Sequence, residues 1–201
     1  MANEIAPKKN RRTLILLLVL LAAPIIASYA LYFWGVRPDS INYGELLEVK
    51  PLAGTASNMG DQTIFRMRQL RGKWVLVSVD SGKCDEQCQQ KLFYMRQVRL
   101  IQNREKDRIE RLWLVDDGKA PAPEIVNKFE GTLLVDAQNS DLLPALPADA
   151  SSRDHIYVID PIGNLMMRFP KDPDPAKMAK DIKRLLQVSQ LEHAMGTDQK
   201  H

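Results

Sequence analysis

Trp74-Val75-Leu76-Val77-Ser78-Val79-Asp80 is the stretch that decides the fold, together with Cys84 and Cys88, which follow it closely. Such a nearly continuous apolar run is typical of a central strand that is covered on both faces. Beyond the cysteines, apolar residues recur about every third position up to residue 101, which predicts an amphipathic helix. The pattern therefore predicts a buried strand that turns into a helix, with two cysteines at the turn.

Strand and helix patterns alternate along the rest of the chain. Apolar or alternating runs predict strands at 64–70, 112–115, 132–136, 155–159 and 165–169, and apolar stripes predict helices at 124–129 and 175–191. This order predicts an α/β domain over residues 64–191 with a parallel sheet flanked by helices. A turn at 160–164 joins the last two strands into a hairpin, which makes the sheet mixed. We expect residues 192–201 to form a flexible tail.

A long uncharged segment precedes the domain. Residues 13–36 carry no charge over 24 positions, and as a transmembrane helix they would reach about 36 Å, enough to cross a bilayer. Four basic residues and one acidic residue precede the segment, so the positive-inside rule keeps residues 1–12 cytoplasmic and exports the rest. The alternative is a cleaved signal peptide with a small-x-small site at 28–30, which also exports the domain. Residues 37–63 contain scattered glycine and proline and indicate a linker with one short extended piece near residues 46–49.

Charge and cysteine content limit the classes of function. The 201 residues include 28 basic and 25 acidic ones, a net charge of +3, which is too low for the basic surface that nucleic-acid binding requires. We therefore expect no nucleic-acid partner. Two cysteines form neither a disulfide scaffold nor a four-thiolate zinc site, but one pair can act as a redox couple or share a metal. In a Gram-negative bacterium the helix would anchor the chain in the inner membrane, and the domain would lie in the oxidising periplasm.

Cys84 and Cys88 are spaced so that both sulfurs lie on one face at the start of a helix. Backbone N–H groups, the helix dipole and the neighbouring Lys83 favour thiolates there, so the pair is expected to be reactive. Two soft thiolates suit Cu(I), and a single imidazole would complete a three-coordinate site. The alternative is a structural disulfide or two inert buried thiols, although a disulfide across so short a loop contributes little stability. We interpret Asp85 and Glu86 as partners of the helix N-terminus rather than metal ligands.

His155 is the histidine that falls inside the predicted domain, since His193 and His201 belong to the expected tail. It opens the strand at 155–159, and the loop before that strand can face the cysteines across the edge of the sheet. His155 is therefore a candidate third metal ligand. The alternative is a half-exposed histidine that is bonded to Asp154 or to solvent.

Together these features resemble the Sco family, the membrane-anchored assembly factors of cytochrome c oxidase. The resemblance rests on the N-terminal span, on the strand 74–80 that leads into Cys84-Asp85-Glu86-Gln87-Cys88, and on Asp154-His155 before the stretch 157–163. By the order of elements it covers roughly residues 60–190. It implies a thioredoxin-like fold in which Cys84, Cys88 and His155 bind copper destined for the binuclear copper site of the oxidase. The same thiols are implied to reduce the cysteines of that site.

Three functions follow from the residues and the resemblance. The first is an assembly factor that binds Cu(I) through Cys84 and Cys88, with His155 as a further ligand, and passes it to the oxidase subunit with the binuclear copper site. The second is a thiol–disulfide reductase in which Cys84 attacks the disulfide of a thiol client and Cys88 resolves the intermediate. The third is a binding module held by a structural disulfide. We favour the copper carrier, tethered to the inner membrane.

Overall fold

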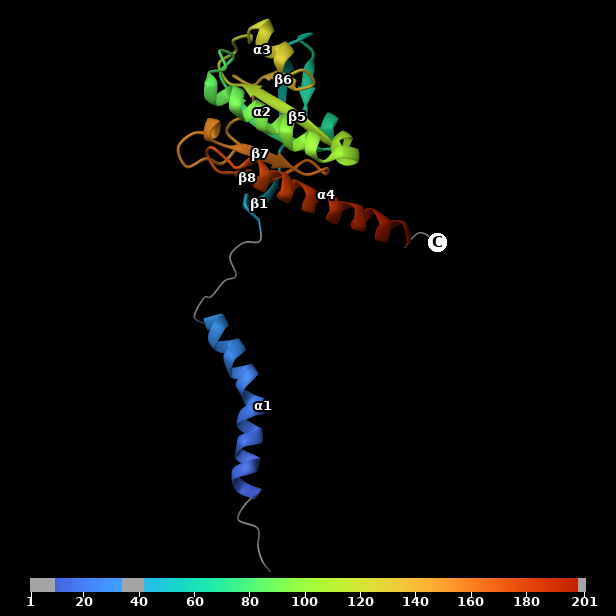
Figure 1. The fold of residues 1–201 in the computed structure, drawn as a ribbon. Helices are drawn as coiled ribbons and strands as arrows, with labels where there is room; N and C mark the ends of the chain where they lie inside the picture. Colours follow the sequence, from blue (N-terminus) through green and yellow to red (C-terminus); the bar gives the residue numbers. More distant parts are fainter. Residues whose placement is uncertain (1–9, 34–41, 199–201) are drawn as a thin grey trace, which may run out of the picture. The chain divides into compact units, whose positions relative to one another are not determined.

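The computed structural model describes residues 10–33 and 42–198, which belong to two compact units. The first unit contains helix α1 (Asn10–Phe33), and the second contains the sheet domain (Figure 1). Within α1, the segment Arg11–Ala30 is long and apolar enough to cross a membrane, and most of its side chains are exposed. The predicted apolar N-terminal helix is thus confirmed. Residues 1–9 of the predicted stub and 34–36 of the predicted span lie outside the described residues.

One mixed sheet forms the centre of the second unit. Among the described residues it has eight strands, in the order β1-β8-β7-β4-β5-β6-β2-β3. They are β1 (Glu45–Pro51), β2 (Thr55–Asn58), β3 (Ile64–Arg66), β4 (Trp74–Asp80), β5 (Ile109–Val115), β6 (Leu133–Asp136), β7 (Ile156–Ile159) and β8 (Asn164–Phe169). Strands β4, β5 and β6 run parallel, whereas every other described pair is antiparallel. The predicted α/β fold with a mixed sheet is therefore confirmed.

Strand β4 is buried along its whole length, as its apolar sequence predicts. Trp74 and Leu76 point into one apolar cluster, while Val75, Val77 and Val79 point into a second cluster on the other face. Pairing with β5 on one side and with β7 on the other leaves the strand no free edge. A strand enclosed in this way holds the residues that follow it in one place, and here those residues are the cysteines.

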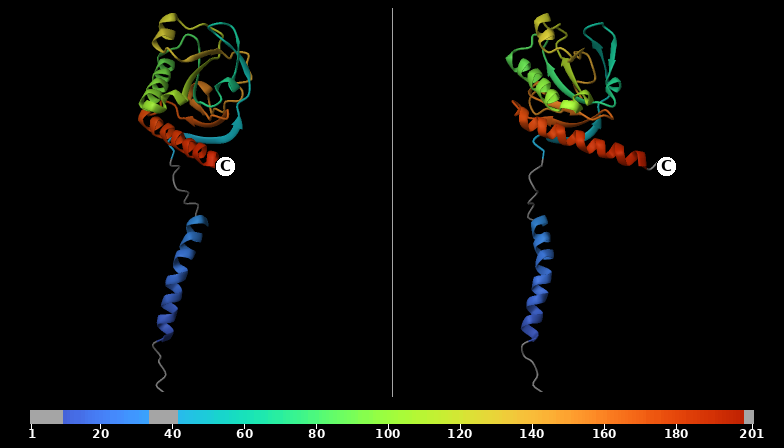
Figure 2. Two further views of the ribbon diagram at one scale, coloured as in Figure 1. Left: turned by 90° about the vertical axis from the view of Figure 1, so that its right-hand side faces the viewer. Right: turned by 45° about the vertical axis from the view of Figure 1, so that its right-hand side comes forward.

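The two faces of the sheet are covered differently. Helices α2 (Glu86–Ile101) and α4 (Pro175–Asp198) pack against each other and cover one face (Figures 1 and 2). The shorter elements are α3 (Pro123–Lys128) and the 3-10 turns η1 (Met67–Leu70), η2 (Asn103–Arg108) and η3 (Ser152–Asp154). On the other face, Leu52, Met67 and Leu142 from connecting segments bury the second apolar cluster. The domain therefore has a helical layer on one side and mainly irregular chain on the other.

The segment before β3 differs from the expected linker over 37–63. Strand β1 pairs with β8 at one edge of the sheet, and β2 pairs with β3 and β6 at the other. Most side chains of β1 are exposed, so backbone pairing rather than apolar burial holds it. The short extended piece predicted near residues 46–49 lies within this strand, whereas its pairing with β8 was not predicted. Residues 37–41 of the expected linker lie outside the described residues.

Several element boundaries also differ from the predicted ones; the strand predicted at 112–115, for example, begins at Ile109. The predicted strand at 64–70 ends at Arg66, because η1 begins at Met67. Helix α4 continues beyond residue 191 to Asp198 and so takes in most of the expected tail. Element ends depend on local capping and packing, which periodicity does not report.

Candidate functional site

Cys84 and Cys88 lie where β4 leads into α2, as the sequence predicts. Asp85 is the N-cap of α2 and accepts a hydrogen bond from the Cys88 backbone N–H at 2.9 Å, which confirms its interpretation as a helix partner. Cys84 has φ of 43°, a left-handed conformation that residues other than glycine adopt rarely and that is frequent at functional sites. The turn brings the two Cα atoms within 5.1 Å, and a disulfide bond joins the sulfurs.

This disulfide is enclosed by the fold. Cys84 is 3% exposed and Cys88 is 0% exposed, and both belong to the apolar cluster beneath α2. The reactive pair that the cysteine spacing predicts is therefore covered by the fold. Cys84 is the more exposed by a small margin, but both residues are covered. An exchange partner therefore needs the turn before α2 to move before it can reach the sulfurs.

The turn that carries Cys84 is fixed to the loop after β5. Asp117 accepts hydrogen bonds from the Ser81 hydroxyl at 2.7 Å and from the Gly82 backbone N–H at 2.9 Å. A Cβ atom on Gly82 would lie 1.8 Å from the carbonyl oxygen of Lys119, so only glycine fits there. Burial alone would raise the pKa of Asp117, but hydrogen bonds from Gly82, Ser81 and Lys119 hold it well below the ordinary value of 3.8. Asp117 is thus a charged anchor of the cysteine turn.

A buried ion pair lies at the same end of the sheet. Asp80, the last residue of β4, lies 2.6 Å from Lys91 of α2, measured from Oδ2 to Nζ. Lys91 also donates to the backbone carbonyl oxygens of Val79 and Arg153. Burial raises the pKa of Asp80, and the positive charge of Lys91 offsets part of this rise. A sequence signal for this pair existed, because Lys91 lies three residues after Cys88, on the stripe of α2 that faces the core.

His155 lies at the end of the sheet where the cysteines are. Strand β7 runs antiparallel to β4, so the first residues of β7 lie beside the last residues of β4. The His155 Nδ1 lies 2.9 Å from the carbonyl oxygen of Phe169, which makes Nδ1 the donor and leaves Nε2 as an acceptor. A metal-binding imidazole uses the same arrangement when its other nitrogen donates to a carbonyl. Asp154, the expected alternative partner, instead pairs with Lys171 at 3.0 Å.

The described residues contain no group of three or more His, Cys, Asp and Glu side chains arranged to hold a metal ion. The structure joins Cys84 to Cys88 and places His155 at the same end of the sheet, but it does not assemble the three as ligands. Sulfurs that are bonded to each other offer no thiolate to a metal, so reduction has to precede metal binding.

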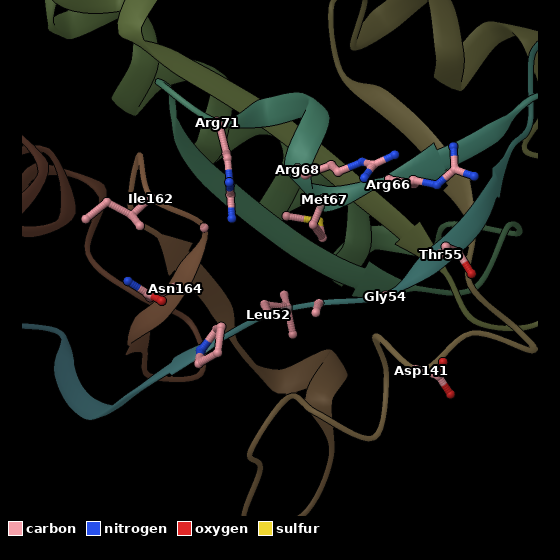
Figure 3. Close-up of a pocket in the computed structure, with 13 residues that line it drawn as sticks. Leu52, Gly54, Thr55, Arg66, Met67, Arg68, Arg71, Asp141, Ile162 and Asn164 are labelled. Carbon is pink, nitrogen blue, oxygen red and sulfur yellow. The ribbon is translucent and has the colours of Figure 1, made fainter.

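A separate cavity of about 500 Å³ lies on the opposite face of the sheet (Figure 3). Leu52 and Met67 contribute its apolar lining, and Arg66, Arg68 and Arg71 are among its polar lining residues. The turn between β7 and β8 completes the lining. This cavity adjoins the start of β4, whereas the cysteines follow the end of β4, so it is not part of the cysteine site.

Taken together, the mixed sheet, the flanking helices and a cysteine pair at a strand-to-helix junction define a protein of the thioredoxin-like class. A family model described as transmembrane-like, thioredoxin-like, C-terminal domain matches residues 74–189, and the chain belongs to this family. No curated protein matches the sequence.

Several solved structures share the fold. Yeast Sco1 with copper bound is 16% identical, with a TM-score of 0.58 over 70% of this chain and 94% of that chain. A SCO1/SenC family lipoprotein from Bacillus anthracis is 17% identical, with a TM-score of 0.52 over 70% of this chain and 97% of that chain. The thioredoxin domain of a thiol-disulfide oxidoreductase from Bacteroides vulgatus is 14% identical, with a TM-score of 0.50 over 70% of this chain and 99% of that chain. These likenesses confirm the predicted thioredoxin-like, Sco-like fold.

Proposed function

We propose that this chain is a membrane-anchored copper carrier of the Sco type. Reduced Cys84 and Cys88 bind Cu(I), with His155 as the third ligand, and the ion passes to the copper-binding subunit of cytochrome c oxidase. The observation that carries the proposal is the β4–α2 junction, which holds two sulfurs in bonding contact at a helix N-terminus. The fold shared with copper-bound yeast Sco1 supports it, as does the assignment of the Sco family to cytochrome c oxidase assembly.

The carrier cycle begins with reduction of the disulfide by a partner dithiol. The partner's thiolate attacks the sulfur of Cys84, the bond between Cys84 and Cys88 breaks, and Cys88 leaves as a thiolate. Backbone N–H groups in the first turn of α2 stabilise that thiolate. The partner's second thiol then displaces Cys84, so the partner leaves as a disulfide and this chain keeps two electrons as a dithiol.

Copper binding follows from the geometry of the reduced pair. Two thiolates from one helix turn converge on one point, which suits a soft ion such as Cu(I). The hydrogen bond from Nδ1 to Phe169 holds His155 in the tautomer whose Nε2 can join them. Ligand exchange with thiolates of the acceptor moves the ion without a change in its oxidation state. Helix α1 keeps the carrier at the outer face of the inner membrane, which raises its effective concentration near a membrane-bound client.

Anaerobic titration of the reduced full chain with Cu(I), in a non-ionic detergent, tests this role. We expect one tightly bound equivalent, which Cys84→Ser or Cys88→Ser abolishes and His155→Ala weakens by roughly 10–100-fold. The matched control is His193→Ala, a histidine of the C-terminal segment, which should leave the affinity unchanged. Weak binding by the wild type, or equal binding by Cys84→Ser, would contradict the carrier role.

The disulfide itself favours a second candidate, a thiol–disulfide reductase, and so does the fold shared with the Bacteroides vulgatus oxidoreductase. In this function Cys84 attacks a client disulfide and Cys88 resolves the mixed disulfide, with no need for His155. Cys88→Ser should then accumulate the mixed disulfide, whereas Cys84→Ser should not, and His155→Ala should exchange at the wild-type rate. A reduction potential below about −300 mV would instead indicate a structural bridge and exclude the reductase.

A further inference from the structure

Strand β5 carries a charged residue on the side that faces the helices. Ile109, Trp113 and Val115 pack into the apolar cluster beneath α2, and the two-residue period of a strand places Arg111 on the same side. Arg111 is only 4% exposed. The other positions on this side of β5 are apolar, so the guanidinium group stands out from the pattern of the core.

The hydrogen bonding of this guanidinium group is incomplete. Its Nη2 donates to the carbonyl oxygen of Glu130 at 2.7 Å, but its buried Nε and Nη1 have no hydrogen-bond partner within residues 10–33 and 42–198. No ion pair between Arg111 and a carboxylate occurs in those ranges either. Burial, and then the positive charges of Arg99 and Arg96, lower the pKa of Arg111. A buried cation without a counter-ion is costly to the folded state, so an anion would be strongly favoured nearby.

Arg111 lines a cavity of about 440 Å³ between the C-terminal half of α2, β5 and the end of α3. The charged residues of the lining are Arg96, Arg99, Glu110, Arg111, Lys128 and Glu130. Four of the six are cations, so the cavity is positive overall. Arg96 and Arg99 are tied to backbone carbonyl oxygens of Lys128 and Ile109, which keeps both guanidinium groups at the cavity.

We propose that this cavity binds a phosphate-type oxyanion, held by Arg96, Arg99 and Arg111. Guanidinium groups pair with phosphate oxygens in a bidentate manner, and the anion supplies a counter-charge that no described residue gives to Arg111. Binding turns the unpaired donors of Arg111 toward the cavity. Gly131, with φ of 78°, leaves space for this movement of the Arg111 side chain, because a Cβ atom at residue 131 would lie 3.1 Å from Arg111 Nη2. The phosphate group can be free in solution or part of a lipid headgroup.

The oxyanion site lies away from the cysteine pair. Arg111 lies opposite Leu76 in the pairing of β5 with β4, whereas the cysteines follow the far end of β4. Along α2, the rise from Cys88 to Arg96 is about 12 Å. Substitutions at one site can therefore be scored without altering the residues of the other.

Titration calorimetry of the full chain with inorganic phosphate, in a non-ionic detergent at constant ionic strength, tests the proposal. The wild type should show saturable binding, and Arg111→Met and Arg96→Gln should each raise Kd at least about tenfold, because each removes a charge-assisted contact. Without phosphate, Arg111→Met should have a Tm no lower than that of the wild type, since it removes an unpaired buried charge. Arg104→Gln is the matched control, because Arg104 is exposed and is not among the lining residues, and it should bind as the wild type does.

A second measurement separates the two sources of phosphate. If short-chain phosphatidylglycerol displaces bound inorganic phosphate at lipid concentrations below the phosphate concentration needed for binding, the natural ligand is a lipid headgroup. If the lipid does not displace phosphate, the natural ligand is free phosphate. Because Arg96 is exposed, Arg96→Gln is expected to fold even if Arg111→Met does not. The proposal is overturned if the wild type binds neither probe, or if the folded variants bind phosphate as tightly as the wild type.

Discussion

Replacement of Lys91 by methionine probes how the cysteine end of the sheet is held together. The folded chain places Lys91 Nζ 2.6 Å from Asp80 Oδ2 and 3.1 Å from the carbonyl oxygen of Val79, and Nζ also donates to the carbonyl oxygen of Arg153. Methionine keeps most of the buried aliphatic volume and removes the charge and all of these contacts. Asp80, whose side chain is 10% exposed, then keeps the hydroxyl of Ser78 at 3.3 Å as its side-chain partner.

The expected loss of folding stability in Lys91→Met is large because the Asp80 carboxylate stays buried without its charged partner. Breaking a buried ion pair in this way costs about 3–5 kcal/mol, out of the roughly 5–15 kcal/mol that stabilise a typical domain. Lys91→Met should therefore unfold at a much lower urea concentration than the wild type. The double variant Asp80→Asn with Lys91→Met should recover most of the loss, since neither charge remains in the core.

The stability that Lys91→Met loses should also depend on pH, and it should be smaller in acid. Burial raises the pKa of Asp80 and Lys91 offsets part of the rise, so removal of Lys91 raises this pKa further. A carboxyl group with a raised folded-state pKa favours folding while it is protonated, and that stability is lost as the pH rises through the folded-state pKa. The deficit of Lys91→Met should therefore be smaller at about pH 5 than at about pH 8.

Urea unfolding of the full chain in a non-ionic detergent, with the disulfide intact, measures both effects. The matched control is Lys83→Met, which removes the same charge from an exposed side chain beside the cysteines and should change stability by less than about 0.5 kcal/mol. A deficit for Lys91→Met below about 1 kcal/mol, or one that does not shrink on acidification, would refute the reasoning, because a buried unpaired charge predicts more.

Three further predictions concern the turn before α2. Gly82→Ala places a Cβ atom 1.8 Å from a backbone oxygen and should cost about 1–3 kcal/mol in urea unfolding, whereas Gly60→Ala, with nothing within 4 Å, should be nearly neutral. Reduction of the Cys84–Cys88 disulfide opens a loop of only five residues and should lower stability by about 2 kcal/mol, the low end of the usual range for disulfides; an unchanged urea midpoint in dithiothreitol would contradict this. Because the folded-state pKa of Asp117 lies below 3.8, its stabilising effect is present above that pH and is lost as the pH falls. Asp117→Asn should therefore lose stability at neutral pH and show a flatter decline below about pH 4 in thermal unfolding, and an unaltered acid profile would exclude the anchor role.

Much of the site could be predicted from short stretches of sequence. The apolar run of β4 predicts a strand with both faces covered, and all seven of its residues are buried. The stripe after Cys88 predicts α2, and Asp85 occupies the N-cap position that its residue type favours. These signals are local, since strand burial, helix period and capping are each set by residues a few positions apart.

Other parts of the site left weak signals or none. The short extended piece predicted near residues 46–49 lies in β1, but its exposed side chains do not indicate that it pairs with β8 at the edge of the sheet. Asp117 lies 35 residues after Gly82 in the chain, and only the parallel pairing of β4 with β5 brings the two together. Lys91 could have been noticed as a charge on an apolar stripe, but its partner at the end of β4 could not have been named.

From its sequence alone, this protein has a long apolar helix followed by an α/β domain in which two cysteines sit at a strand-to-helix turn, because periodicity and spacing are properties of neighbouring residues. Only the tertiary structure decided that the cysteines are enclosed, that Asp80 and Lys91 share the core beside them, and that Arg111 is buried with no counter-ion among the described residues. Burial depends on elements that are distant in the chain and pack over one another, so it can be assigned only once the whole sheet and its covering helices are in place.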